Sequence, residues 1–183
     1  MNLEYKFDNI SLRILDKQYA SMILAFCNRN KEIFEHYEID KPLNFYTLAF
    51  QEKLVEAEYN GFLHGTYVRF YMFDKRIPDK IIGTISFSDM KRNAFFSCQI
   101  GYKIDSDYVN QGYGFKMLSN SILIMKNECN MHRIGAYILP ANQPSIKLVE
   151  KVGFKLEGIA KSYVQMKGKW IDHLCYAYIS TLD

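Results

Sequence analysis

The sequence lacks long apolar runs and cysteine pairs, and these two absences narrow the class of protein. No stretch of the 183 residues is long and apolar enough to span a bilayer, although aliphatic and aromatic residues make up 49%. The N-terminus, MNLEYKFDN, carries acidic residues and no apolar segment of the kind found in secretory signals. Four cysteines, Cys27, Cys98, Cys129 and Cys175, lie far apart without a CxxC motif. We therefore expect no disulfide framework and no zinc site, and a reducing cytoplasm fits this usage.

The excess of positive over negative charge is also small, since the formal net charge is only +3. This mild excess admits an acidic ligand such as a nucleotide cofactor, but it lacks the strong basic stripe typical of nucleic-acid binding. The chain contains no internal repeat, low-complexity tract or linker. Its length suits one domain, residues 1–183, with a substantial core. We expect no direct contact with nucleic acid or membrane.

The strongest local pattern lies between residues 96 and 126. Residues 96–104 alternate between apolar and small or polar side chains, which predicts a half-buried strand. Apolar residues then recur at helical spacing over 115–125, and the sequence NQGYG at 110–114 supplies a turn between them. A strand that enters a helix through a glycine turn leaves amides unpaired at the positive end of the helix dipole. Such a junction can bind a phosphate or pyrophosphate.

Two standard nucleotide motifs are missing from this turn. GxGxxG would need a glycine in place of Met117, and a Walker loop would need Gly-Lys-Ser/Thr, which is absent. The glycines also have a simpler interpretation, a tight connection without a ligand, which the pattern alone leaves open. An anion bound here would be held differently from the ligands of dinucleotide dehydrogenases or P-loop ATPases.

Patterns along the rest of the chain predict an α+β (mixed α/β) fold with about seven strands and four or five helices. Short turns join the strands at 66–73, 80–90 and 96–104, which predicts an antiparallel meander. The other expected strands cover residues 11–15, 133–139, 154–160 and 173–180. The expected helices cover residues 16–26, 28–38, 45–60, 115–125 and 142–152.

Several motifs together indicate a family. Residues 92–102 read RxxFFxCxIGY, the turn contributes Gln111-Gly112-x-Gly114, and Asn142-x-x-Ser145 follows about thirty residues later. The tail carries GFxxEGxAKxY at 153–163 and GxWxDH at 168–173. With these motifs the chain resembles the GNAT acyl-CoA-dependent N-acetyltransferases, and within them the RimJ/RimL branch that acetylates protein N-termini, notably of ribosomal proteins. The resemblance covers most of the chain and implies the GNAT fold, with a mixed sheet flanked by helices, and acetyl-CoA as acyl donor.

The resemblance also implies where the cofactor binds. The pantetheine arm would hydrogen-bond to the backbone of Tyr102 and Ile104, like an added strand. The family's turn motif, (Q/R)xxGx(G/A), begins here at Val109, so one polar contact of the family is missing. The amides that would hold the pyrophosphate belong to Gln111, Gly112, Tyr113, Gly114, Phe115 and Lys116.

Acetyl transfer requires a polarised thioester carbonyl and a proton for the departing thiolate. The resemblance implies that the backbone N–H of Tyr102 stabilises the carbonyl oxygen and that the Ser145 hydroxyl donates the proton. Asn142 would orient the pantetheine amides. Both Asn142 and Ser145 have an alternative role as helix caps. No spacing of His, Cys or Glu predicts a metal site and no Ser-His-Asp arrangement is indicated, so we expect direct attack by the amine.

A strong general base is not evident in the sequence. Many relatives carry Glu where this chain has Gln99, and some place an acid where it has Val164. Glu38, Glu157 and Asp172 are base candidates, each with a structural or surface role as the alternative. At pH 7 roughly one α-amine in ten is neutral, against roughly one lysine in 2,500. A site without a carboxylate base therefore favours protein N-termini as acceptors.

Three functions remain open from the sequence. The first is a cytoplasmic peptide α-N-acetyltransferase that uses acetyl-CoA. The second acetylates a small amine, such as an amino sugar, a polyamine or an amino-acid derivative. The third is a non-catalytic acyl-CoA-binding protein, motivated by Gln99 and Val164. A homodimer is also left open. Phe34, Tyr37 and Phe45 are candidates to line an acceptor groove.

Overall fold

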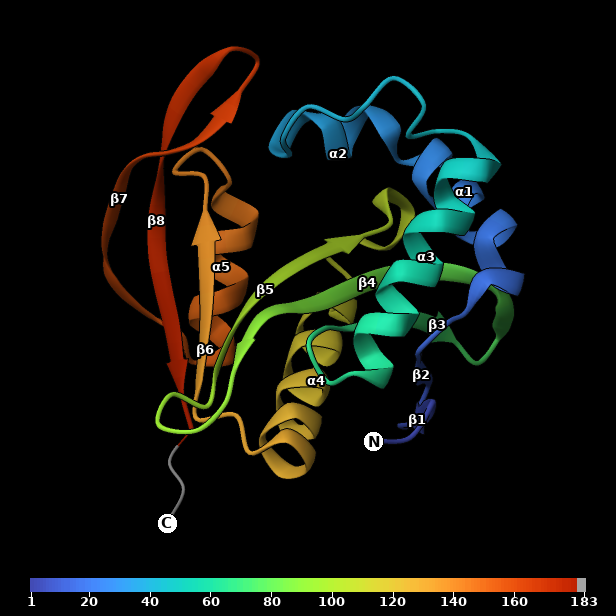
Figure 1. Cartoon of the computed structure of the whole chain (residues 1–183), viewed down its shortest axis with the longest axis horizontal. Coiled ribbons are helices and arrows are strands. Elements are labelled where there is room, and N and C mark those ends of the chain that lie inside the picture. Colours follow the sequence, from blue (N-terminus) through green and yellow to red (C-terminus); the bar gives the residue numbers. More distant parts are fainter. Residues whose placement is uncertain (181–183) are drawn as a thin grey trace.

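Hydrogen bonds join eight strands into one open sheet, in the order β1-β2-β3-β4-β5-β6-β8-β7 (Figure 1). The computed structural model describes residues 1–180, so the last three residues of the expected domain 1–183 lie outside the described residues. Every neighbouring pair is antiparallel except β5 and β6, which are parallel. The strands are β1 (Glu4–Lys6), β2 (Ile10–Arg13), β3 (Val68–Asp74), β4 (Ile77–Lys91), β5 (Ser97–Ile104), β6 (Arg133–Ile138), β7 (Lys155–Met166) and β8 (Lys169–Ile179).

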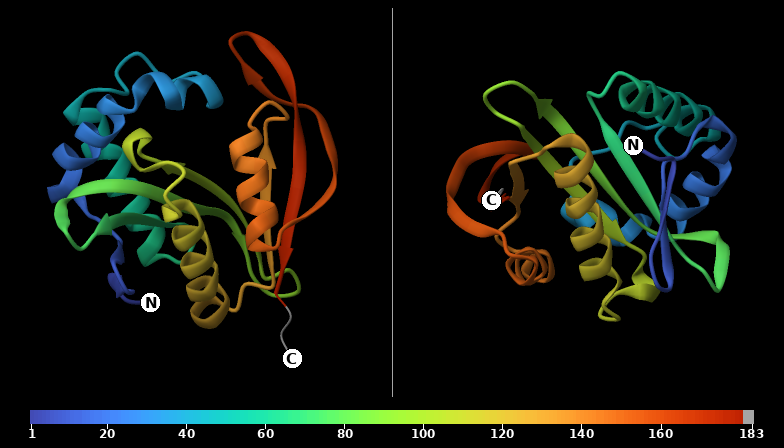
Figure 2. Two further views of the ribbon diagram at one scale, coloured as in Figure 1. Left: turned by 180° about the vertical axis from the view of Figure 1, so that it is seen from behind. Right: turned by 90° about the horizontal axis from the view of Figure 1, so that it is seen from below.

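Five α-helices cover the two faces of this sheet. They are α1 (Ala20–Arg29), α2 (Lys31–Tyr37), α3 (Leu48–Leu63), α4 (Tyr113–Cys129) and α5 (Gln143–Val152). The view from behind in Figure 2 shows α4 and α5 in front of the strands, whereas α1, α2 and α3 lie on the other side. The predicted mixed sheet with flanking helices is confirmed. None of the helices in residues 1–180 combines the length and the apolar character needed to cross a bilayer.

The central strands are buried on both faces, which explains their nearly continuous apolar sequence. On β3, Phe70 and Met72 pack into the core beneath α4, whereas Tyr71 and Phe73 pack into a second core beneath α1 and α3. The same alternation on β5 sends Cys98, Ile100, Tyr102 and Ile104 toward α4. The opposite face of β5 therefore carries Gln99, Gly101 and Lys103.

Two of the strands that differ in extent from the sequence-based expectation are β1 and β7. β1 was missed because its three residues are too few to show alternation. The strand expected at 154–160 continues to Met166, past a register shift between Ala160 and Val164. Ser162 has φ of 47° within that shift, so a bulge interrupts the alternation and hides the continuation.

A buried ion pair holds α1 against the segment that leads from β5 to α4. The Asp105 side chain is completely buried and accepts a hydrogen bond from Arg29 Nε at 2.5 Å. Beside it, the Ser106 amide donates to Asn30 Oδ1 at 2.8 Å. The end of α1 therefore fixes the start of the loop that reaches the glycine turn.

Replacing Asp105 with asparagine should destabilise the fold, because the charge of Arg29 would lose its buried partner. The expected loss in free energy of unfolding is about 3 kcal/mol. Denaturant unfolding of Asp105→Asn measures it. Asp107→Asn is the matched control, since Asp107 is 70% exposed and meets Lys80 Nζ at 3.4 Å. Its cost should stay below about 1 kcal/mol. Equal losses in the two variants would contradict the structural role of Asp105.

Candidate active site

The two halves of the sheet separate between β5 and β6. These strands pair only at Ser97–Arg133, Cys98–Ile134 and Gln99–Gly135. Beyond Gln99 the two strands diverge, as Figure 1 shows, and no strand in residues 1–180 pairs with β5 on that side. Backbone groups from Ile100 to Ile104 therefore border a gap between β5 and β6. An extended pantetheine arm has the shape and the hydrogen-bonding groups to fill such a gap.

The glycine turn leads into this region and leaves a set of free amides. Gly112 is the N-terminal cap of α4 and has φ of 83°, a left-handed conformation that favours glycine. No acceptor within residues 1–180 receives the amides of residues 111–115. These amides lie at the positive end of a 17-residue helix, which is a favourable site for a diphosphate.

The backbone amide of Lys116 differs from the other amides of the predicted set, because it is not free. This amide already donates to the Gly112 carbonyl at 3.1 Å, as the first bond of the helix. The Lys116 Nζ atom lies 2.7 Å from Asn9 Oδ1. The helix begins at Tyr113, two residues before the expected start, and this earlier start consumes the Lys116 amide. The Lys116 amide is therefore engaged within the helix, and the amides left open for a diphosphate are those of residues 111–115.

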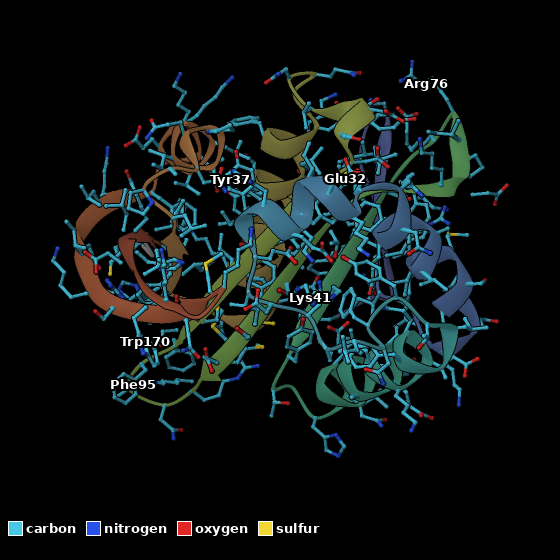
Figure 3. The ribbon with its side chains drawn as sticks, turned by 90° about the horizontal axis from the view of Figure 1, so that it is seen from above. Glu32, Tyr37, Lys41, Arg76, Phe95 and Trp170 are labelled. Atoms are coloured by element: carbon cyan, nitrogen blue, oxygen red, sulfur yellow. The ribbon has the colours of Figure 1, made fainter. Side chains whose placement is uncertain are left out.

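The side chain of Tyr113 anchors the turn instead of reaching toward the gap. Its hydroxyl donates to the buried carboxylate of Asp74 and accepts from Arg76 Nη2 at 2.9 Å. The hydrogen bonds from Arg76 hold the pKa of Asp74 well below its usual value. Figure 3 shows Arg76 at the edge of the molecule, at the β3–β4 turn. Only the backbone amide of Tyr113 is therefore available to a ligand.

Gly114 allows close contact between two helices. A Cβ at this position would lie 2.9 Å from Leu148 Cδ2 of α5 and 3.6 Å from Ile104 Cγ1 of β5. Nearby, Gln111 Nε2 donates to the Asp107 carbonyl at 2.7 Å. Lys151 Nζ lies over the half-exposed ring of Phe115, 5.2 Å from the centre of the ring. The turn, α5 and the end of β5 thus meet at one side of the gap.

A pair of hydroxyls lies next to the gap, where β5 faces α5. Tyr102 Oη lies 2.5 Å from Ser145 Oγ and 3.2 Å from the Ser145 carbonyl oxygen. Burial raises the pKa of Tyr102 to about 12, although its hydrogen bond with Ser145 opposes that shift. The phenol therefore stays protonated at neutral pH. The sequence analysis predicted a role for the Tyr102 backbone N–H but no contact of the Tyr102 phenol with Ser145. Strand alternation does place this side chain on the α5 side of β5.

Asn142 fills the capping role that the sequence left as its alternative. Its Oδ1 atom accepts a hydrogen bond from the Ser145 amide at 3.2 Å and so caps α5. This bond uses the backbone of Ser145 and leaves the Ser145 hydroxyl for Tyr102. The cap therefore fixes the position of the hydroxyl pair at the gap.

The three acidic base candidates are all engaged in ion pairs. Burial alone would raise the pKa of Glu38, but the charges of Lys103 and Lys41 outweigh it and lower that pKa. A hydrogen bond from Arg133 lowers the pKa of Glu157, and one from Lys161 lowers that of Asp172. A carboxylate with a lowered pKa is a weaker proton acceptor. All three acids are therefore weaker proton acceptors than an unpaired carboxylate.

Gln99 and His173 are two further polar side chains of the sheet. A Cβ on Gly135 would collide with the Gln99 amide, and Gln99 Oε1 is buried without a hydrogen-bond partner in residues 1–180. His173 is buried, with Nδ1 at 3.2 Å from the Ile171 carbonyl. No group of three or more His, Cys, Asp or Glu side chains in the described chain could hold a metal ion.

Gly112→Val should abolish binding of coenzyme A, because a branched side chain strains the left-handed turn and enters the space where the diphosphate would approach. Calorimetry with coenzyme A measures this loss. Gly168→Val is the matched control, since Gly168 has φ of 76° and equally open surroundings but lies in the β7–β8 turn. Both variants should lose similar stability, whereas only Gly112→Val should lose affinity. Normal affinity in Gly112→Val would count against the assignment of this turn.

Comparison with known proteins identifies the family. A model described as an acetyltransferase (GNAT) domain matches residues 10–155. The chain is 29% identical over 178 residues to the probable N-acetyltransferase YjcK of Bacillus subtilis (strain 168), covering 97% of this chain and 98% of that protein. It is 30% identical over 174 residues to the ribosomal protein uS5-alanine N-acetyltransferase of Escherichia coli (strain K12), with 93% and 87% covered.

Solved structures agree with this result. The ribosomal-protein-S5-alanine acetyltransferase from Vibrio fischeri has a TM-score of 0.92 at 28% identity, covering 99% of this chain and 98% of that one. A RimL structure solved with coenzyme A has a TM-score of 0.88 at 20% identity, covers 97% of each chain, and shows a shared fold. The chain therefore belongs to the GNAT acetyltransferase family, in its RimJ/RimL type, and is an N-acetyltransferase that uses acetyl-CoA.

Proposed function

We propose that this enzyme acetylates the N-terminal α-amine of a protein, with a ribosomal protein as the acceptor class. The observation that carries the proposal is the pairing of Glu38, Glu157 and Asp172 with cations, which leaves the site without a free carboxylate base. An α-amine needs such a base far less than a lysine does, because a tenth of it is already neutral at pH 7. The acceptors named for the similar E. coli and Vibrio fischeri enzymes belong to the same class.

Acetyl-CoA supplies an activated acetyl group as a thioester, and the chain's own residues would bind it and manage the protons. The free amides of residues 111–115 would hold its diphosphate, and the backbone of Tyr102 and Ile104 would align its pantetheine arm. The Tyr102 N–H would donate to the thioester oxygen as charge develops there. Water would carry away the proton that the attacking amine loses.

The hydroxyl pair would return a proton to the departing thiolate. Ser145 Oγ would donate it, the Tyr102 phenol at 2.5 Å would replace the proton on Ser145, and water would then return a proton to Tyr102. The raised pKa of Tyr102 supports this role, because the phenol keeps its proton at the pH where the amine reacts. We further propose that residues 1–183 act as one domain and that the enzyme works in the cytoplasm.

The acceptor class is tested by a thiol-release assay with Ala- or Ser-starting peptides beside amino sugars, polyamines and amino-acid derivatives. Peptides should be acetylated, and the rate should rise with pH up to about 7.7–8.0, where the α-amine loses its proton. Blocking the α-amine with a formyl group should abolish turnover even when the peptide contains lysine. Turnover of small amines alone would remove the proposed acceptor. Binding of coenzyme A without turnover of any amine would favour a non-catalytic protein.

Ser145→Ala should lower kcat by about a hundredfold or more and leave affinity for coenzyme A nearly unchanged, because it removes the proton donor. The variant keeps the cap of α5, since Asn142 binds the backbone amide of residue 145. Steady-state kinetics and calorimetry on the same preparation separate the two effects. Asn142→Ala is the complementary variant and should cost about 1 kcal/mol of stability through loss of the cap. An unchanged kcat in Ser145→Ala would exclude its role as acid.

A further inference from the structure

Gly101 occupies a position where the fold does not require glycine. Its φ is not positive, and a Cβ there would meet only Ser86 Oγ at 3.6 Å, an ordinary contact. A glycine inside a strand costs backbone entropy and marks a place where a ligand comes close. Gly101 is also exposed, directly beyond the point where β5 leaves β6. The missing side chain therefore opens space on the sheet beside the gap.

This open space lies on the side from which an amine would reach the thioester. Tyr102 and Ser145 are on the α4 and α5 side of β5, whereas Gly101 faces the opposite side by strand alternation. In Figure 3, α2 crosses above β4 and β5 on this opposite side, with Lys41 lying over the strands. We use the term acceptor groove for the place on this face, over Gly101 and between Gln99 and Lys103, where the acceptor would lie.

A cluster of three charges forms one end of the acceptor groove. Glu38 binds Lys103 Nζ through Oε1 and Lys41 Nζ through Oε2, each at 2.6 Å. Two ammonium groups and one carboxylate leave a net charge of +1. All three side chains are between 17% and 22% exposed, so the cluster is reachable from one side. Lys103 pairs with no second carboxylate among residues 1–180.

The spacing along β5 relates this cluster to the acceptor. A strand rises about 3.3 Å per residue, so Lys103 lies about 7 Å along β5 from Gly101. An extended peptide with its amine over Gly101 covers that distance in two residues. Its second or third side chain would therefore reach Lys103. The rings of Phe34 and Phe45, which contact Lys103 and Lys41, exclude water and strengthen attraction for an opposite charge.

We infer that the acceptor groove selects peptides with an acidic side chain at their second or third residue, and that Lys103 is the specificity-determining residue. This inference rests on the proposed acetylation of protein N-termini and names a substrate class for it. A neutral peptide binds without this attraction, and a basic peptide or a polyamine meets a net positive cluster. Glu38 orients the two lysines and limits their combined charge.

The experiment measures kcat/KM for C-terminally amidated peptides that differ only at the second and third residues, which are both Glu, both Gln or both Lys. The wild-type enzyme should prefer the Glu peptide over the Lys peptide by on the order of tenfold. Lys103→Met should abolish the preference, and Lys103→Arg should keep it. Glu38→Gln should increase it, because the cluster gains a positive charge. Lys53→Met, on the exposed surface of α3, is the control and should change nothing.

Several outcomes would overturn the inference. Equal rates for the three peptides with the wild-type enzyme would do so, as would a preference that survives in folded Lys103→Met with normal coenzyme A affinity. Preference for the Lys peptide would assign recognition to Glu38 instead. Faster acetylation of free glutamate than of any peptide would make the groove an amino-acid site. Turnover of no peptide at all, with coenzyme A still bound, would remove the proposed function as well.

Discussion

The parting of β5 from β6 is the constraint on which the rest of the site depends. Parallel pairing stops after Gln99 and Gly135, so the facing edges of both strands carry unpaired backbone groups. Such edges are costly unless water or a ligand satisfies them. Beside the gap, Tyr102 of β5 contacts Ser145 of α5, so this contact joins α5 to β5 where β6 has left it. An acyl donor with an extended amide-bearing arm is chemically suited to these edges.

At the proposed anion site, the side chains are used for structure and the amides are left free. Tyr113 is tied to Asp74 and Arg76, so the first turn of α4 is fixed to the β3–β4 turn. Gly114 allows Leu148 to pack against the same turn. Preorganised amides need no rearrangement to receive a diphosphate, which increases affinity by reducing the cost of ordering. For the proposed binding, we therefore expect the absence of a polar side chain at Val109 to have a limited effect on affinity.

Sequence reasoning succeeded where the signal was local and failed where it depended on distant contacts. The glycine turn and the Asn142 cap were predictable because each involves residues within a few positions of one another. The Tyr102–Ser145 contact joins residues 43 positions apart, and the Arg133–Glu157 pair joins residues 24 apart. Alternation and spacing carry no information on such partners. The fate of the Lys116 amide was missed for another reason, since helix starts are uncertain by one or two residues.

The ion pairs that make the acids weaker bases also shape the acceptor side of the sheet. Lys103 lowers the pKa of Glu38, and in return Glu38 keeps one of the charges around it neutralised. A free glutamate here would be a stronger base, whereas the proposed role of the paired cluster is to sort acceptors by charge. Under the proposed function, the acceptor is an amine that is already partly neutral. On this proposal, restricting the base and recognising the acceptor are two results of one interaction.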